Sequence, residues 1–215
     1  MAVFSRTFAV ALVLAVAGLP VRAQTTPALN ARSKGSSKAP VTVYEMSDFQ
    51  CPYCRQFVEE TFPRLERDYI ATGKVRWIFI NYPLTSVHQH AAAAAQLGMC
   101  AAQQQGFWKM HDLLFKYQET WAPLKEPGPF FVSLADSAGL SKPVLLSCLD
   151  SPETLNSVRA DAEGAARSGA TSTPTFYIEG GLLEGALPIE VFRQVLDSVY
   201  GVKAGKTGGT GKKGS

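Results

Sequence analysis

The sequence predicts an α/β protein in which a helical block separates two segments that contain β-strands. A β-favouring stretch at 41–46 precedes a helical pattern, and a second strand pattern follows at 74–82. Residues 84–168 then carry almost no strand signal, and β signals return at 174–184. Strand, helix and strand joined by a crossover of this length predict a βαβ unit with parallel pairing. The expected order is therefore βαβ, helical block, ββα.

The first helix is expected over 54–71. Pro63 should kink it because proline lacks the backbone N–H group, and Gly73 should end it. The apolar positions follow an approximate helical stripe, at Phe57, Val58, Phe62, Leu65 and Ile70.

The helical block is expected to hold five helices. The alanine-rich run 91–102 has high helix propensity, and 106–117 is amphipathic. Three more helices are expected over 130–138, 142–149 and 152–167. Ser151 is suited to cap the last of them, with Pro152 at its first position.

The C-terminal part predicts an antiparallel hairpin and a helix. A strand over 174–179 and another over 182–184 flank the Gly180-Gly181 turn. An amphipathic helix is expected over 188–200.

Both ends of the chain differ from its body. Residues 1–23 resemble a secretory signal with Arg6, an apolar run over 8–19 and a small-residue cleavage pattern; an uncleaved membrane anchor is the alternative. Residues 24–39 are expected to be a flexible linker, too short for a dimerisation domain. Residues 203–215 are expected to form a disordered basic tail. One domain over 40–202 remains.

Composition limits the possible partners. The chain has 215 residues with 46% apolar side chains, enough for one core. Its net charge of +3 is misleading, because nine of the 21 basic residues lie outside 40–202. The remaining 12 oppose 18 acidic residues, a net charge of about −6 that gives no support for nucleic-acid binding.

Cys51 and Cys54 form a C-x-x-C motif at a strand-to-helix junction, which is the layout of a dithiol redox site. The free N–H groups and dipole at the helix N-terminus favour a thiolate at Cys51, and Cys54 lies one turn further on. Pro52 suits the first helical turn. The same motif is half of a zinc site, but His88, His90 and His111 give no ligand spacing. A purely structural disulfide is a further alternative, disfavoured by the small loop.

Three segments resemble the DsbA-like thiol-disulfide oxidoreductases. D-F-Q-C-P-Y-C-R-Q-F resembles the family's active-site segment, G-F-W-K-M-H-D-L-L-F a part of its helical insertion, and T-P-T-F its cis-proline strand. All three stand in the family's order, and the resemblance covers about 40–200. It implies a thioredoxin fold with an inserted helical domain over about 84–168.

The resemblance also implies roles for five residues. Cys51 would be the surface nucleophile and Cys54 its buried partner. Pro174 would be a cis-proline facing the disulfide, and Thr173 would pair its backbone with substrate; an ordinary strand-start proline is the alternative. Glu45 would be a buried acid exchanging protons with Cys54, against the alternative of an exposed edge glutamate.

Tyr53 departs from the strongly oxidising members, which carry histidine there. Tyrosine offers less stabilisation to the thiolate, and a less stabilised reduced form makes a weaker oxidant. Thr173 also resembles the residue of isomerase-like relatives. Tyr53 and Pro52 are therefore expected to modulate the site, and the direction of electron flow stays open.

Cys100 and Cys148 are interpreted as a structural disulfide of the helical block, closing a loop of 47 intervening residues. Two free buried thiols are the alternative. His88 and His90 are interpreted as a helix-start feature rather than a metal site.

The leading hypothesis is an exported, monomeric dithiol oxidase of the periplasm or cell envelope, without metal or cofactor. Its substrates would be unfolded or reduced exported proteins, and a membrane quinone-linked partner, DsbB-like or VKOR-like, would re-oxidise it. A disulfide isomerase or reductase of the same fold is the first alternative. A peptide-binding chaperone or metal carrier is the non-enzymatic one.

Overall fold

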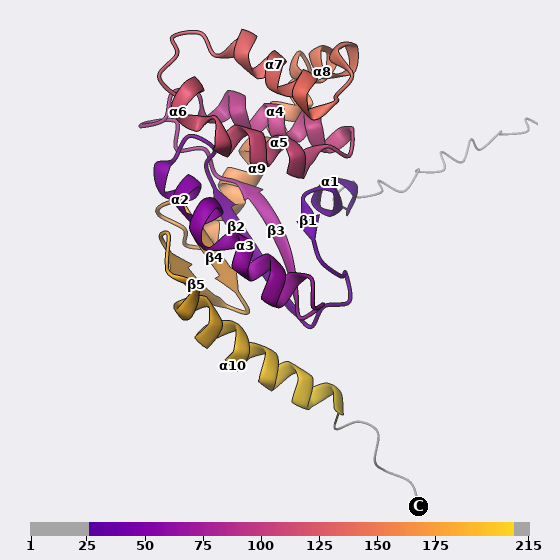
Figure 1. The fold of residues 1–215 in the computed structure, drawn as a ribbon, viewed down its shortest axis with the longest axis vertical. Helices are drawn as coiled ribbons and strands as arrows, with labels where there is room; N and C mark the ends of the chain where they lie inside the picture. The colour runs from indigo at the N-terminus through magenta and orange to yellow at the C-terminus, as the bar shows by residue number, and fades with distance from the viewer. Residues whose placement is uncertain (1–25, 209–215) are drawn as a thin grey trace, which may run out of the picture.

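The structure, a computed structural model, describes residues 26–208. The expected signal segment at 1–23 and the chain after 208 lie outside this range. Within it, a five-stranded sheet is covered by helices on both faces and capped at one end by a helical block (Figure 1). The elements of the sheet are β1 (Ser33–Lys34), β2 (Val41–Ser47), β3 (Val75–Asn81), β4 (Thr175–Ile178) and β5 (Gly181–Glu184).

The strand order is β1-β3-β2-β4-β5. Strand β2 is central: it pairs parallel with β3, in the register Glu45↔Phe79, and antiparallel with β4, in the register Glu45↔Phe176. Strands β4 and β5 form the expected antiparallel hairpin. The predicted βαβ and ββ pairings are therefore observed, and the thioredoxin fold with a helical insertion is confirmed.

The first expected helix is divided into three parts, at Thr61 and between Leu65 and Glu66. The sequence predicted a kink at Pro63; in the structure Thr61 ends one helix and caps the next, and the last part adopts π-helical hydrogen bonding. These parts are α2 (Pro52–Glu60), α3 (Phe62–Leu65) and η1 (Glu66–Ile70). Proline at an early position of α3 lacks the N–H group that would continue the ladder.

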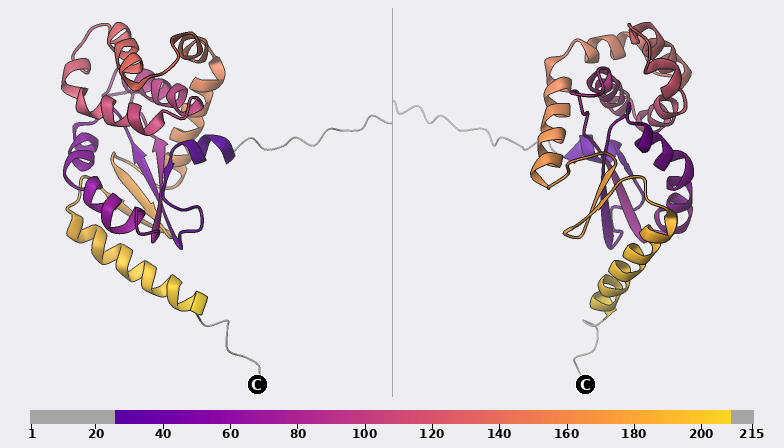
Figure 2. Two further views of the ribbon diagram at one scale, coloured as in Figure 1. Left: turned by 45° about the vertical axis from the view of Figure 1, so that its right-hand side comes forward. Right: turned by 90° about the vertical axis from the view of Figure 1, so that its left-hand side faces the viewer.

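The helical block is more finely divided than the sequence predicted, because a separate short helix, α6, follows α5. The block holds α4 (Ala91–Gln103), α5 (Phe107–Lys116), α6 (Gln118–Trp121), α7 (Gly128–Ala138), α8 (Lys142–Leu149) and α9 (Pro152–Arg167). Ser151 caps α9 as expected, because its side chain accepts a hydrogen bond from the Glu153 amide. Figure 2 shows α9 on one face of the sheet, with α2 and α3 on the other.

The linker expected over 24–39 is different in the structure. From Thr26 onward it contains α1 (Thr26–Ala31) and β1, which pairs antiparallel with β3. Arg32 between them is buried, forms an ion pair with Asp161 of α9, and donates to the Phe79 carbonyl oxygen at 3.2 Å. Polar composition suggested a linker, but these long-range contacts order the segment.

The segment expected to form a disordered tail is partly helical. Helix α10 (Ile189–Gly208) extends past 203, so part of the expected disordered tail is helical. Residues 209–215 lie outside the described range.

Two apolar cores adjoin along α2, where the partly buried Val58 packs against both. One lies between the sheet and α2, α3 and α10, and the other fills the helical block. Phe49, just before the cysteine motif, belongs to the second core and stacks on Phe79 of β3, with ring centroids 4.9 Å apart. The segment that leads into Cys51 is therefore held by both parts of the fold. No helix within 26–208 is long and apolar enough to cross a lipid bilayer.

Candidate active site

The two cysteines of the motif lie at the start of α2, as the sequence predicted. Cys51 is the N-cap residue, with extended backbone at φ −73° and ψ 123°, and Pro52 opens the helix. Both cysteines are free thiols in this structure. Cys54 is fully buried one turn further along. The pair therefore lies where unpaired amide groups favour an anion.

Cys51 lies against a cis peptide bond from a distant part of the chain. The Thr173–Pro174 bond is cis, and Cys51 Sγ donates a hydrogen bond to the Thr173 carbonyl oxygen at 3.3 Å. Cys51 is only 4% exposed, more enclosed than the surface nucleophile that was expected. The Thr173 segment and the helical block cover it, which local sequence could not indicate.

The two thiols have opposite acidities. The pKa of Cys51 is lowered from 9.0 to about 6, first by the hydrogen bond from the Cys54 thiol. The Thr173 side chain and the amides of Tyr53 and Cys54 lower it further, and burial opposes this. Burial raises the pKa of Cys54 well above 9.0. Cys51 is therefore the thiolate and Cys54 the protonated partner near neutral pH.

Glu45 lies on central strand β2 and is fully buried, not at an exposed edge. Trp77 Nε1 donates a 2.7 Å hydrogen bond to its Oε2. Burial raises the pKa of Glu45 from 4.5, while His111, Trp77 and Ser47 lower it. Alternation along the strand predicted this inward direction.

Asp48 is a residue of the site that sequence reasoning missed. Its side chain is buried and accepts hydrogen bonds of 2.8 Å from the amides of Gln50 and Leu84, while His88 Nδ1 lies 2.8 Å from it. Its own amide donates to Cys54 Sγ at 3.5 Å. An aspartate two residues before a bonded amide is a common turn pattern, and this is the signal that could have found it.

Gln118 is the second missed residue. It lies on α6, is buried, and donates through Nε2 to the carbonyl oxygens of Phe49 and Cys51 at 2.8 and 2.9 Å. The helical block therefore holds the active-site segment through its backbone. Nothing in the local sequence around Gln118 indicated this contact.

Tyr53 is 63% exposed, and its side chain therefore lies at the surface of the site. His88 and His90 lie near the start of α4, where His90 is the N-cap residue and its Nε2 lies 2.8 Å from the Leu124 carbonyl oxygen. Within 26–208 no group of three histidine, cysteine or acidic side chains is arranged to hold a metal ion.

Cys100 and Cys148 form a disulfide between α4 and α8, with an S–S distance of 1.99 Å. Both are buried among the apolar residues of the helical block. This second pair is separate from the redox motif.

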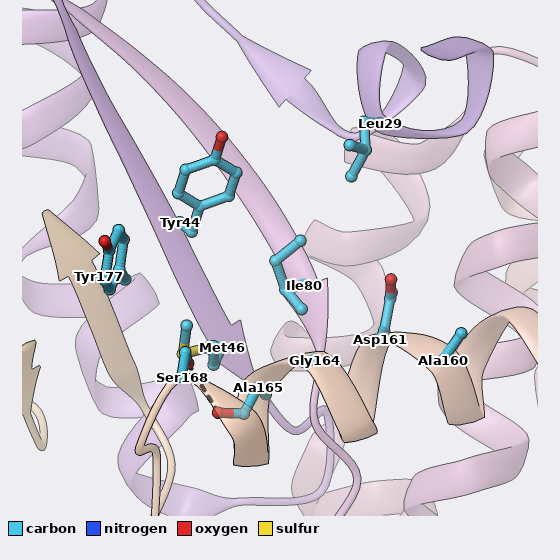
Figure 3. A pocket seen from close by; sticks show the side chains of 10 residues that line it. All are labelled: Leu29, Tyr44, Met46, Ile80, Ala160, Asp161, Gly164, Ala165, Ser168 and Tyr177. Carbon is cyan, nitrogen blue, oxygen red and sulfur yellow. Dashed lines mark hydrogen bonds between the residues drawn. The ribbon is translucent and has the colours of Figure 1, made fainter. Parts of the chain in front are cut away.

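A cavity of about 450 Å³ lies on the α9 face of the sheet (Figure 3). Tyr44 and Tyr177 project over the strands there, and Leu29 of α1 borders it. Asp161, the acidic residue in its lining, is occupied by Arg32 and Asn81. The cavity contains no thiol.

The family model described as Thioredoxin matches residues 28–198. The chain belongs to the thioredoxin family. Among curated proteins it is 33% identical over 167 residues to Na(+)/H(+) antiporter NhaA 3 of Salinispora tropica, covering 78% of this chain and 24% of that protein. The chain thus spans about a quarter of that relative.

Other relatives match over most of their length. Disulfide bond formation protein D of Bacillus subtilis is 28% identical, covering 76% of this chain and 74% of that protein. The fold is that of alpha-DsbA1 from Wolbachia pipientis, with 23% identity, a TM-score of 0.73 and coverage of 82% and 94%. BdbD from Bacillus subtilis gives 24% identity, a TM-score of 0.71 and coverage of 79% and 92%. The expected DsbA-like resemblance within the thioredoxin family is confirmed.

Proposed function

We propose that the chain is an exported protein thiol-disulfide oxidoreductase that introduces disulfides into substrate proteins through Cys51 and Cys54. The observation that carries this proposal is the division of acidity within the motif. One thiol has a pKa of about 6 beside the Thr173 carbonyl, and the other is buried and protonated. A dithiol site needs one sulfur that forms the mixed disulfide and leaves readily, and one that waits.

The cycle follows from this division. A substrate thiolate attacks Cys51 Sγ of the disulfide form, the Cys51–Cys54 bond breaks, and Cys54 leaves with the electron pair and takes up a proton. A second substrate thiolate then attacks the substrate sulfur of the mixed disulfide, and Cys51 leaves as a stabilised thiolate. The substrate is oxidised by two electrons and the Cys51–Cys54 pair is reduced.

The backbone of Thr173 would hold the substrate. Its carbonyl oxygen faces Cys51 Sγ at 3.3 Å, and an extended substrate segment bound alongside Thr173 and Pro174 would bring its own sulfur to Cys51. Glu45 would supply and receive the Cys54 proton, because burial holds its pKa above that of an ordinary carboxyl group. Pro52 and Tyr53 would modulate the acidity of Cys51.

An isomerase or reductase of the same fold is the second candidate. Tyr53 favours it, because its largely exposed side chain offers the Cys51 thiolate neither positive charge nor a buried donor. The direction of electron flow therefore depends on the reduction potential.

The proposed substrates, cell compartment and redox partner are inferred by analogy with the relatives. Disulfide bond formation protein D of Bacillus subtilis is matched over most of its length. By analogy the substrates are reduced exported proteins, the compartment is the periplasm or cell envelope, and a membrane quinone-linked protein, DsbB-like or VKOR-like, re-oxidises the pair. The protein would act as a monomer, with Cys100–Cys148 as its structural disulfide.

The deciding experiment is a redox titration of the purified chain, residues 24–215, in glutathione buffers. A potential above about −200 mV supports the oxidase, and a value near the −270 mV typical of thioredoxin supports the reductase or isomerase. The C51S variant is the control, because only Cys100–Cys148 can titrate in it. If wild type and C51S titrate alike, the redox proposal fails.

The same variant tests the chaperone alternative. A peptide-binding chaperone would keep its effect on the aggregation of a reduced client when Cys51 is replaced by serine. An oxidoreductase would lose thiol oxidation in the same variant.

A further inference from the structure

Two buried titratable side chains outside the cysteine pair come from different parts of the fold. Glu45 belongs to central strand β2, and His111 belongs to α5 of the helical block; both are 0% exposed. Glu45 Oε1 and His111 Nε2 each lack a hydrogen-bond partner among the described residues. An unpaired buried polar atom costs stability, so its retention in a core calls for an explanation.

The two side chains share their apolar neighbours. Phe79, the register partner of Glu45, meets the His111 ring edge-on at 5.4 Å between centroids. Phe62 lies 5.3 Å from Trp77, which donates to Glu45, and 6.3 Å from His111. These rings exclude water, and in such surroundings charges interact strongly.

Electrostatic interactions connect His111, Glu45 and Cys54. The charge of His111 lowers the pKa of Glu45 against the larger effect of burial. Ser47, two residues further along β2, lowers the pKa of both Glu45 and Cys54 through its hydroxyl group. Ser47 Oγ has no hydrogen-bond partner among the described residues. The order is Cys54, Ser47, Glu45, His111.

The far end of this series reaches solvent. His111 Nδ1 lies 2.8 Å from Oδ1 of Asp112, whose side chain is 64% exposed. An ionised carboxylate only accepts hydrogen bonds, so Nδ1 carries the proton and Nε2 presents a lone pair to the core in the neutral ring.

The neighbouring elements add apolar rings and one paired charge to the surroundings of Glu45 and His111. Strand β4 presents Phe176 as the second register partner of Glu45, and α10 adds Phe192. Lys34 of β1 stands 4.9 Å from the Trp108 ring, which also contacts His111 at 5.0 Å between centroids, and its charge is paired with Glu66 of η1. Among these neighbours the titratable groups on the route itself are Cys54, Glu45 and His111.

We propose that His111 is a positioning residue that passes the proton exchanged between Glu45 and Cys54 to solvent at Asp112. This proposal rests on the proposed function. When Cys54 leaves as a thiolate, it takes a proton through the Ser47 hydroxyl group from Glu45, and the carboxylate regains one from Nε2 of the imidazolium ring. When Cys54 is deprotonated for disulfide formation, the proton moves the opposite way, and Nδ1 releases one at Asp112.

The test replaces His111 by phenylalanine, which keeps a planar ring in the aromatic surroundings and removes both nitrogens. The measurement is the pH dependence of the rate at which the reduced pair is oxidised by oxidised glutathione. Without the imidazolium charge, the Glu45 midpoint should move to higher pH by about one unit, which slows the reaction about tenfold on the acidic side. In an E45Q background, H111F should add no further change.

Two further variants separate loss of the imidazole group from a general loss of packing. H111Q retains a polar side chain that cannot take a proton, and it should shift the midpoint as H111F does even if H111F folds poorly. F115L removes a ring that packs 5.0 Å from His111 and leaves every titratable group in place. It should lower thermal stability and leave the midpoint where it is.

A wild-type midpoint in H111F and H111Q, or effects of H111F and E45Q that simply add, would overturn the proposal. The pH dependence of unfolding reports the same Glu45 midpoint without any thiol exchange. If H111F shifts the Glu45 midpoint in unfolding but the wild-type protein shows no thiol-disulfide exchange, the proposed function is refuted. The coupling between His111 and Glu45 then still holds.

Discussion

Replacing Cys54 by alanine should raise the pKa of Cys51, because the hydrogen bond from the Cys54 thiol is the largest cause of its lowering from 9.0 to about 6. At pH 7 a thiol with a pKa of about 6 is roughly 90% thiolate, and one with a pKa of 9.0 is about 1% thiolate. Complete loss of the lowering would therefore slow alkylation of Cys51 by up to about 90-fold. C54S is the matched control, since its hydroxyl group still donates.

The assay is the ultraviolet absorbance of the thiolate against pH, together with the alkylation rate by iodoacetamide. C54A should titrate well above wild type, and C54S should remain nearer to wild type. Equal midpoints in wild type, C54A and C54S would refute the assignment of the low pKa to this hydrogen bond.

The same shift predicts the oxidising strength of the pair. A lowered pKa stabilises the reduced protein, fully so above 9.0 and not at all below about 6. At pH 7 only the interval between the pKa of about 6 and the solution pH contributes, which stabilises the reduced protein by about 1.4 kcal/mol. The disulfide is therefore about 30 mV more oxidising than a pair with an ordinary thiol. The advantage should grow as the pH rises from 6 to 9, and a potential that follows the ordinary thiol at every pH would contradict it.

Three further predictions concern the surroundings of the site. The free energy of unfolding should fall as pH rises from 4.5 through the raised pKa of Glu45, because the folded state then binds more protons than the unfolded state. Urea titrations at several pH values measure this fall, and E45Q should abolish it. Gln118→Ala should cost about 1–3 kcal/mol in chemical denaturation, because it leaves the Phe49 and Cys51 carbonyl oxygens unpaired, and a smaller loss than in the exposed control Gln56→Ala would contradict this. The double replacement C100A/C148A should lower the free energy of unfolding by about 2–4 kcal/mol through the loop that it opens, while the alkylation rate of Cys51 stays unchanged.

Part of the site could be found in the sequence because its determinants are neighbours in the chain. Cys51, Pro52 and Cys54 fall at the start of a helix through a strand-to-helix change of pattern that spans few residues. The inward direction of Glu45 follows from the alternation of β2 alone. The order of strands and helices followed from hydrophobic period and turn residues in the same way.

Other parts of the fold could not be predicted because distant segments decide them. Residues 26–34 have the polar composition of a linker, yet pairing of β1 with β3 and burial of Arg32 order them. Cys51 was expected at the surface, and the Thr173 segment, 122 residues away, covers it. Gln118 reaches the active-site backbone across 67 residues.

The sequence by itself therefore determined where the candidate thiol pair lies in the fold and on which kind of element, because spacing along the chain sets local conformation. The tertiary structure decided how acidic those groups are and what they contact. The hydrogen bond from Cys54 and the side chain of Thr173 lower the pKa of Cys51, and burial raises the pKa of Cys54. Burial also raises the pKa of Glu45, and the neighbouring His111 opposes this rise. These effects depend on distance in space, and the packing of the helical block against the sheet fixes that distance.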